Sequence, residues 1–471
     1  MKSIKSHKFF SKAVLLVIVS VSLQSCFVAK DYKRPEFEDT QNLYRTDNFP
    51  TDSISMADVS WKTLFTDSYL NQYIEEGLQN NLDIRIAIQQ ILSAEAYLKQ
   101  GKAGFLPTLN AKGTATHQEL AKNSQFGSIF NGSIEQFELS TTLSWEADIW
   151  GKIRSNKRAY QASYLQSVAA HQAVKTKLIS SIATTYYQLL ALDAQLAITK
   201  ETIQTREKGV ETIKALKDAG QVTQVAVDQN IAQYNNAKAL QVDLETAIFK
   251  TENALSILLG KPAQNFERSP LEAQHIDTDL KLGVPALLLA NRPDVKSAEY
   301  NLIQSFELTN VARSNFYPSL TLTATGGFQS LELDKLVNSN SLFATVVGGL
   351  TQPIFNQRKI KTQYEVAKAK QEQALLNFKK SLLVAGNEVS NALYDYRAET
   401  KKYQFRENEV EALRQAEQNS EALLNNGFAN YLDLLTARQS ALNAELNVID
   451  SKLNQLLSVV NLYEALGGGL K

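Results

Sequence analysis

Few side chains in this sequence have the types and spacing that catalysis or metal binding needs. Cys26 is the only cysteine, so no disulfide can form within one chain. The four histidines are scattered without the spacing of a zinc site. No Ser/His/Asp arrangement, paired acids or phosphate-binding glycine loop stands out. We therefore predict a protein that is not an enzyme and needs no metal or cofactor; an enzyme on a coiled-coil scaffold, the alternative, has no such constellation to support it.

Cys26 stands at the end of a segment typical of an exported protein. The first 25 residues carry four lysines and no acid, and their apolar run Ala13–Leu23 is much shorter than the ~20 residues a transmembrane helix needs. Ser25-Cys26 directly after that run resembles the bacterial lipobox, which is cut before an acylated cysteine. A stray buried thiol is the alternative. Each buried acyl methylene adds ~0.8 kcal/mol to membrane binding, and Phe27 in the next position favours the outer membrane.

The remaining chain contains the same set of motifs twice. The pentapeptide Phe105–Leu109 recurs as Phe316–Leu320 after 211 positions, and Gly220 recurs as Gly427 after 207. Offsets that agree this closely indicate a structural duplication. We divide the chain into a signal peptide (1–25), a lipidated extended arm (26–66), a first repeat (67–260), a linker (261–284) and a second repeat (285–471).

Each repeat begins with a short helix and two strands. Apolar residues at helical spacing predict helices over Asp67–Gln100 and Pro285–Ser314. After each, two segments of about ten residues alternate apolar and polar side chains, which predicts strands. Such strands fit a half-exposed soluble sheet or a membrane barrel. Their length, the lipid anchor and the aromatic ends favour the barrel, with Trp145 and Trp150 in the aromatic girdle at a membrane interface; ordinary core packing is the alternative.

Each repeat then continues into a very long helical segment. Lys152–Leu259 and Gln357–Leu466 contain no proline and only two glycines each, and strong helix formers dominate their composition. If Gly220 and Gly427 mark hairpin tips, the arms before them run roughly 65 residues, on the order of 100 Å. Helices of that length suit coiled-coil packing. The predicted fold is therefore mainly α-helical with a membrane sheet.

Four strands cannot close a barrel in a membrane, because the smallest bacterial barrels have eight. An open sheet in lipid would leave edge backbone groups unsatisfied at several kcal/mol each. Several copies of the chain must therefore pool their strands. The formal net charge of zero gives no reason to expect a nucleic acid partner.

Several motifs together resemble the outer-membrane factor family, the TolC-like exit ducts of tripartite efflux pumps. The run Asn425–Gln439 and the terminal Val460–Gly469 carry most of the likeness, the latter to the OprM/NodT-type lipoprotein branch. Asp31–Pro35, Asn291–Asp294 and the Phe-x-Pro motif before both strand pairs also match. These motifs span essentially the whole mature chain.

The resemblance implies a homotrimer whose twelve-stranded outer-membrane β-barrel continues as an α-helical barrel into the periplasm. It implies a passive duct for small molecules, with a periplasmic adaptor and an inner-membrane transporter, of the resistance-nodulation-division type, as partners. Protein secretion of type I and metal efflux are alternatives. A periplasmic adaptor is a weaker one, since adaptors have one hairpin and this chain has two.

The hairpin tips carry the predicted functional residues. Gly220 and Gly427 suit turns that need a positive φ, and Thr223 and Asn430 suit the N-caps of the returning helices. We predict an adaptor-docking role for these four residues in addition to turn building. Three further residues are predicted to narrow the closed end of the tunnel: Phe428, Tyr431 and Asp433. The alternative for Asp433 is a solvated helix N-terminus.

Overall fold

The computed structural model describes residues 28–36, 60–129, 133–274, 292–428 and 430–468. The predicted lipidation site Cys26 lies outside these residues, as does most of the predicted arm. The chain divides into two compact units, each built from segments of both repeats. The first comprises residues 1–35, 91–167 and 298–378, and the second comprises 36–90, 168–297 and 379–471.

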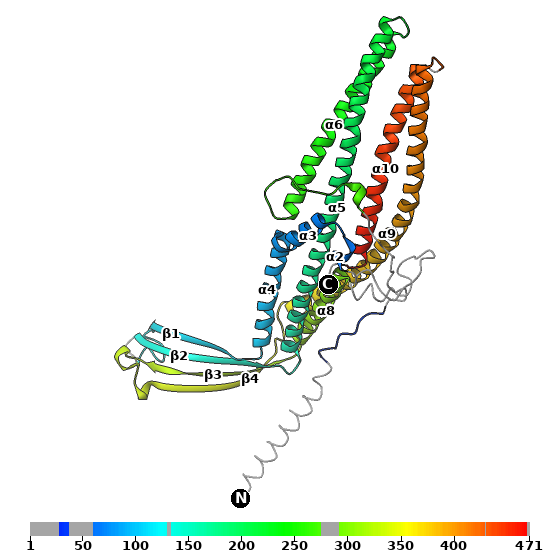
Figure 1. Ribbon diagram of the computed structural model, residues 1–471. Coiled ribbons are helices and arrows are strands. Elements are labelled where there is room, and N and C mark those ends of the chain that lie inside the picture. The colour runs from blue at the N-terminus through cyan, green and yellow to red at the C-terminus, as the bar shows by residue number, and fades with distance from the viewer. Residues whose placement is uncertain (1–27, 37–59, 130–132, 275–291, 429, 469–471) are drawn as a thin grey trace. The chain divides into compact units, whose positions relative to one another are not determined.

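The first unit contains one antiparallel sheet of four strands in the order β1-β2-β3-β4 (Figure 1). The strands are β1 Thr108–Glu119, β2 Ser133–Ala147, β3 Ser319–Ser330 and β4 Leu342–Thr351. Each repeat supplies one hairpin, and β2 pairs with β3 to join them. Within the described residues, β1 and β4 are each paired along one side only. The predicted strands are confirmed, and the sheet is open in a single chain.

Gly327 in β3 lies tightly against the neighbouring hairpin, whereas the adjacent Gly326 does not. Gly327 pairs with Ser140, and a Cβ added at Gly327 would lie 2.2 Å from the backbone oxygen of Leu139. At Gly326 the nearest atom to an added Cβ is 3.6 Å away, which is an ordinary contact. Only a glycine therefore fits at position 327 of this sheet.

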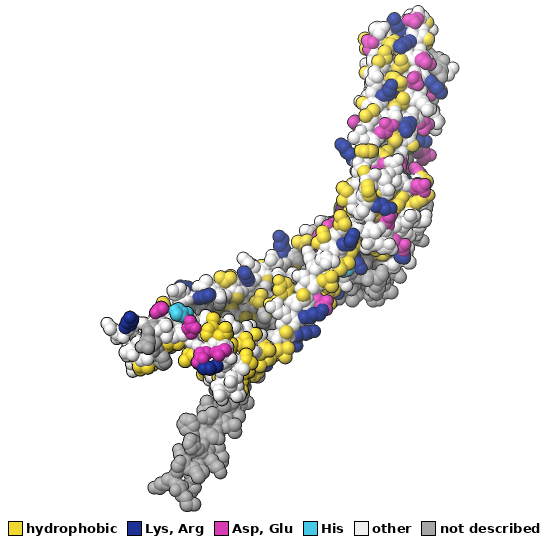
Figure 2. Space-filling view, turned by 90° about the vertical axis from the view of Figure 1, so that its left-hand side faces the viewer, with side chains coloured by type: hydrophobic (Ala, Val, Ile, Leu, Met, Phe, Trp, Pro, Cys, Tyr) yellow, Lys and Arg dark blue, Asp and Glu magenta, His cyan; other side chains and the backbone are white. Residues whose placement is uncertain are grey.

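The long helices confirm the duplication. The first hairpin is α5 Lys152–Asp218 followed by α6 Gln224–Leu258, and the second is α9 Lys359–Asn425 followed by α10 Tyr431–Ala465. The first arm has 67 residues and the returning arm 35 residues in both hairpins. Figure 1 shows α6 running back along α5 and α10 running back along α9. Acidic and basic side chains are interspersed over the hairpin helices on the face that Figure 2 shows.

The predicted single helix over Asp67–Gln100 is wrong, because the chain forms two helices there. α3 spans Ser68–Asn80 and α4 spans Leu82–Ala103. Between them, the buried Asn81 accepts hydrogen bonds from the backbone amides of Asp83 (2.9 Å) and Ile84 (3.2 Å). Its side-chain amide donates to the carbonyl of Leu258 at 2.9 Å. Asn81 thus caps a new helix and ties it to the end of α6.

The remaining elements are short or begin later than predicted. The helix predicted to start at Pro285 is described from Pro293, as α8 Pro293–Ser314, and residues 285–291 lie outside the described part. The described residues also include four single-turn elements: α2 Trp61–Leu64, η4 Leu271–Ala273, η5 Leu333–Lys335 and η6 Ser339–Ser341. In the part of the chain that is described, no helix combines the length and hydropathy of a membrane span.

Aromatic side chains form the core of the second unit near the base of the hairpins. Phe65 packs edge-on against Tyr187 and Tyr463 at ring distances of 6.4 and 6.1 Å, and all three are almost fully buried. Arg292 donates to the carbonyl of Ala465 at 2.9 Å. These contacts join the middle of α5, the end of α10 and the start of α8.

Candidate functional site

Both hairpin tips turn through a left-handed glycine, as predicted. Gly220 and Gly427 each have a φ of 75°. The amide of the residue after each glycine donates back to a helix carbonyl, from Gln221 to Leu216 and from Phe428 to Leu423, at 2.9 Å. This is the hydrogen bonding of a Schellman C-cap. An added Cβ would meet no atom within 4 Å at either glycine, so backbone conformation alone demands the residue.

The two returning helices are capped differently. Thr223 and Asn430 are the N-caps, as predicted. Asn430 accepts from the amide of Asp433 at 3.0 Å, and Asp433 accepts from the amide of Asn430 at 3.2 Å, which completes a capping box. Thr223 makes no side-chain cap hydrogen bond, and Ala226 stands where the second tip has Asp433. The first tip is therefore the less firmly closed of the two.

The three residues predicted to form a gate lie in different surroundings. Phe428 is 81% exposed and Asp433 is exposed, whereas Tyr431 is 8% exposed. Tyr431 belongs to a cluster that joins both hairpins, together with Ile213, Val227 and Leu434. Its hydroxyl donates to the side-chain oxygen of Asn230 on α6. Burial raises the pKa of Tyr431, and nearby Arg438 opposes the rise. Tyr431 therefore links the hairpins, and its role in a gate remains a prediction.

Behind the tips, two arginines connect all four long helices. Arg206 on α5 donates to the side-chain oxygens of Gln233 on α6 (2.7 Å) and Gln439 on α10 (2.8 Å). Arg438 on α10 lies 3.1 Å from a carboxylate oxygen of Glu421 on α9. Sequence reasoning missed this arginine layer, because both residues look like the solvated charges of a long helix.

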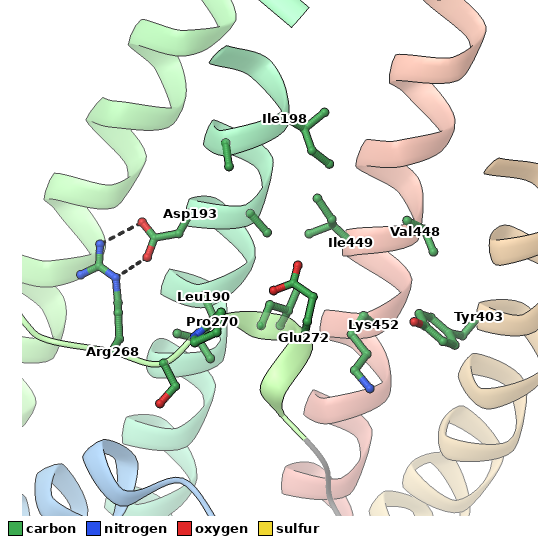
Figure 3. Close-up of a pocket in the computed structure, with 14 residues that line it drawn as sticks. Leu190, Asp193, Ile198, Arg268, Pro270, Glu272, Tyr403, Val448, Ile449 and Lys452 are labelled. Atoms are coloured by element: carbon green, nitrogen blue, oxygen red, sulfur yellow. Dashed lines mark hydrogen bonds and ion pairs between the residues drawn. The ribbon is translucent and has the colours of Figure 1, made fainter. Parts of the chain in front are cut away.

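A cavity of about 680 Å³ lies between α5, α9, α10 and the segment around η4 (Figure 3). On one side Arg268 donates to Asp193 at 2.9 Å and to Glu252 at 2.6 Å. The hydrogen bond to Asp193 is the main cause that raises the pKa of Arg268. On the other side the Lys452 ammonium lies 5.4 Å from the ring centroid of Tyr403. Arg268 thereby holds the segment before η4 to both α5 and α6.

The two tryptophans predicted for the membrane girdle lie at the base of the sheet. Trp145 donates to the carbonyl of Phe105 at 3.0 Å and keeps an exposed ring. Trp150 donates to the carbonyl of Pro318 at 2.7 Å and stacks on Tyr317 at 5.0 Å. Each indole therefore has a polar anchor beside a Phe-x-Pro motif, and the girdle role remains a prediction. Within the described ranges, no group of three or more His, Cys, Asp or Glu side chains could hold a metal ion.

Comparison with solved structures identifies the class of protein. The outer-membrane channel OprN has a TM-score of 0.85 to this chain at 24% identity, covering 94% of this chain and 99% of OprN. The open state of the MtrE outer membrane channel of Neisseria gonorrhoeae has a TM-score of 0.82 at 26% identity, covering 94% and 98%. The fold is that of an outer-membrane channel.

A family model described as outer membrane efflux protein matches residues 73–261 and 284–468, one stretch in each repeat. The chain belongs to this family and is an outer-membrane efflux channel. It is 26% identical to the cation efflux system protein CusC of Escherichia coli O157:H7, over 96% of this chain and 97% of that one. It is 27% identical to the antibiotic efflux pump outer membrane protein ArpC of Pseudomonas putida, over 96% and 95%. The probable outer membrane lipoprotein SilC of Salmonella typhimurium is 26% identical, over 98% and 99%.

Proposed function

We propose that three copies of this chain form the exit duct of a tripartite efflux pump, joined at the hairpin tips to a periplasmic adaptor and through it to an inner-membrane transporter. The observation that carries this proposal is the open four-stranded sheet. Its unpaired edge groups would each cost several kcal/mol in lipid, and four strands are too few to close a barrel. Three copies supply twelve strands, and β1 of one copy pairs with β4 of the next.

The duct is held in the outer membrane by a lipid on Cys26 in addition to its barrel. The lipobox-like sequence and the likeness to a protein named an outer membrane lipoprotein support this assignment. Labelled palmitate should enter the wild-type protein and not Cys26→Ser, and incorporation into Cys26→Ser would refute the assignment.

The tips dock the adaptor, and the two tips are not equivalent docking sites. Each presents an exposed glycine turn, with Gly220 and Thr223 at the first and Gly427 and Asn430 at the second. The capping box fixes only the second tip, so the adaptor meets one rigid and one looser turn in each copy. Tip residues cross-linked to the adaptor in cells would support this docking, and cross-links confined to the sheet unit would contradict it.

The closed end is narrowed by Phe428, Tyr431 and Asp433. In a trimer three Asp433 carboxylates form a ring of like charge, and Tyr431 holds the second hairpin to Asn230 of the first. Asp433→Ala and Tyr431→Ala should therefore raise single-channel conductance in planar bilayers. Unchanged conductance in both variants would remove these residues from the gate.

The cargo is small molecules, and selection among them belongs to the transporter. Relatives at 26% and 27% identity are named for cation efflux and for antibiotic efflux, so the substrate does not follow overall sequence likeness in this family. Disruption of the gene should raise intracellular accumulation of a transported dye, and restoration by the wild-type gene tests the duct function. Type I protein secretion is the competing function, and loss of a secreted protein without dye accumulation would favour it.

A further inference from the structure

Arg206 is a buried cation that the fold pairs only with neutral side chains. It lies on α5 about four helical turns before Gly220 and is 7% exposed. Among the residues that the structure describes, its hydrogen-bond partners are the amide oxygens of Gln233 and Gln439. Its Nε is buried and donates no hydrogen bond.

Charged side chains of both signs lie near Arg206, but among the described residues no carboxylate forms an ion pair with it. Arg438 on α10 carries the same charge, and Glu417 on α9 already lies 3.3 Å from the Nε of Arg438. Burial, followed by the charge of Arg438, lowers the pKa of Arg206, while Tyr431 and Glu417 oppose this effect.

For the Arg206 guanidinium, the free energy lost on burial is close to the free energy gained from its hydrogen bonds. Removing a charged group from water costs several kcal/mol, and a hydrogen bond to a charged group returns about 1.5–3 kcal/mol. Two such bonds offset most of the cost and leave little surplus. A carboxylate in place of either glutamine would turn this hydrogen bond into an ion pair and add the attraction between opposite charges.

The two glutamines differ in what they hold together. Gln233 lies on α6, within the same hairpin as Arg206, whereas Gln439 lies on α10 of the other hairpin. A cavity of about 260 Å³ between α5, α9 and α10 is lined by charged residues of both signs, namely Arg206, Arg414, Arg438, Glu201, Glu417, Glu421 and Glu445. Water entering this cavity would hydrate the guanidinium as the hairpins part.

We infer that Arg206 is the positioning residue that clasps the first hairpin to α10, and that the neutral Gln439 keeps this clasp weak enough to release when the duct widens. The inference rests on the proposed function as a duct, whose bore is set by the separation of the hairpins. Residue 439 thereby sets how readily the tunnel opens.

The test compares Gln439→Glu with Gln233→Glu in the full-length trimer in planar bilayers. Both variants place one carboxylate next to Arg206. Only Gln439→Glu places it on the other hairpin, so only this variant strengthens the link between the hairpins. Gln439→Glu should lower the open probability about tenfold, and Gln233→Glu should change it less than twofold. Adding Arg206→Gln to Gln439→Glu should remove the decrease and restore the open probability to the wild-type value or above it.

Equal open probabilities for the two glutamate variants, or no restoration by Arg206→Gln, would overturn the inference. If Gln439→Glu does not assemble, Arg206→Met decides: it removes the clasp without adding charge and should raise the open probability at least twofold, and an unchanged value refutes the clasp. A wild-type trimer that conducts no ions would instead refute the duct function itself.

Discussion

Replacing Arg268 by methionine should destabilise the second unit far more than removing an exposed ion pair. The Arg268 side chain is 15% exposed and lies between the carboxylates of Asp193, 39% exposed, and Glu252, 10% exposed. Without the arginine, Asp193 can recover water, but Glu252 remains a buried carboxylate with no cation. Removing one partner of a buried ion pair leaves the other charge without a counter-charge and lowers the free energy of unfolding by about 3–5 kcal/mol.

The assay is thermal unfolding followed by the helical circular dichroism signal of the detergent-extracted protein. The second unit has about 280 residues. With an unfolding entropy of roughly 2.1 cal/mol/K per residue, a loss of 3–5 kcal/mol lowers its Tm by roughly 5–9 °C. Lys177→Met is the matched control in the same unit, because Lys177 and Glu464 are 69% and 32% exposed. An exposed pair of this kind contributes about 0–1 kcal/mol.

Adding Glu252→Gln to Arg268→Met should recover part of the lost stability, because a neutral amide is less costly to bury than a carboxylate. The reasoning would be refuted if Arg268→Met lowered Tm no more than Lys177→Met. It would also be refuted if the second substitution lowered Tm further.

Three other predictions concern the sheet, the tips and the acid limit of stability. Gly327→Ala should abolish assembly in the outer membrane, because its Cβ would overlap the neighbouring strand at 2.2 Å, whereas Gly326→Ala, at 3.6 Å, should assemble normally; equal yields would contradict this. Asn430→Ala should cost about 1 kcal/mol and speed hydrogen exchange at the second tip, whereas Thr223→Ala, which removes no cap bond, should leave exchange at the first tip unchanged. Burial would raise the pKa of Asp67, but hydrogen bonds from Leu70 and Gln274 outweigh it and lower the pKa below its ordinary 3.8. The carboxylate therefore stabilises fully above pH 3.8 and loses this effect as the pH falls through the folded value, so acid unfolding should be less pH-dependent below pH 4 in Asp67→Asn.

The sequence predicted those features that local pattern and duplication determine. The turn at Gly220 needs only a left-handed residue after a helix, and its recurrence as Gly427 set the hairpin lengths. The strands could be predicted because apolar side chains alternate with polar or small ones along most of their length. Their open edges follow from counting four strands in one chain.

The features that the sequence did not predict depend on partners distant in the chain. Asn81 interrupts a helix whose apolar spacing is continuous in the sequence. It does so partly because its side chain hydrogen-bonds a carbonyl of α6, 177 positions away. Arg206 is indistinguishable by type from the surface charges of the same helix. Only the packing of α6 and α10 around it shows that it is buried.

The corners that lead from sheet to long helix differ between the two repeats. The first uses Gly151, with a φ of 75°, whereas the second holds Gln357 and Arg358 at φ values of 55° and 64°. A non-glycine residue in this conformation costs on the order of 1 kcal/mol or more. In the proposed trimer, three corners with a relaxed backbone and three with a strained backbone would alternate around the channel. The two repeats would give the channel wall an approximate sixfold symmetry of shape, but its backbone strain would have only threefold symmetry. A ligand that binds one kind of corner would therefore have three binding sites.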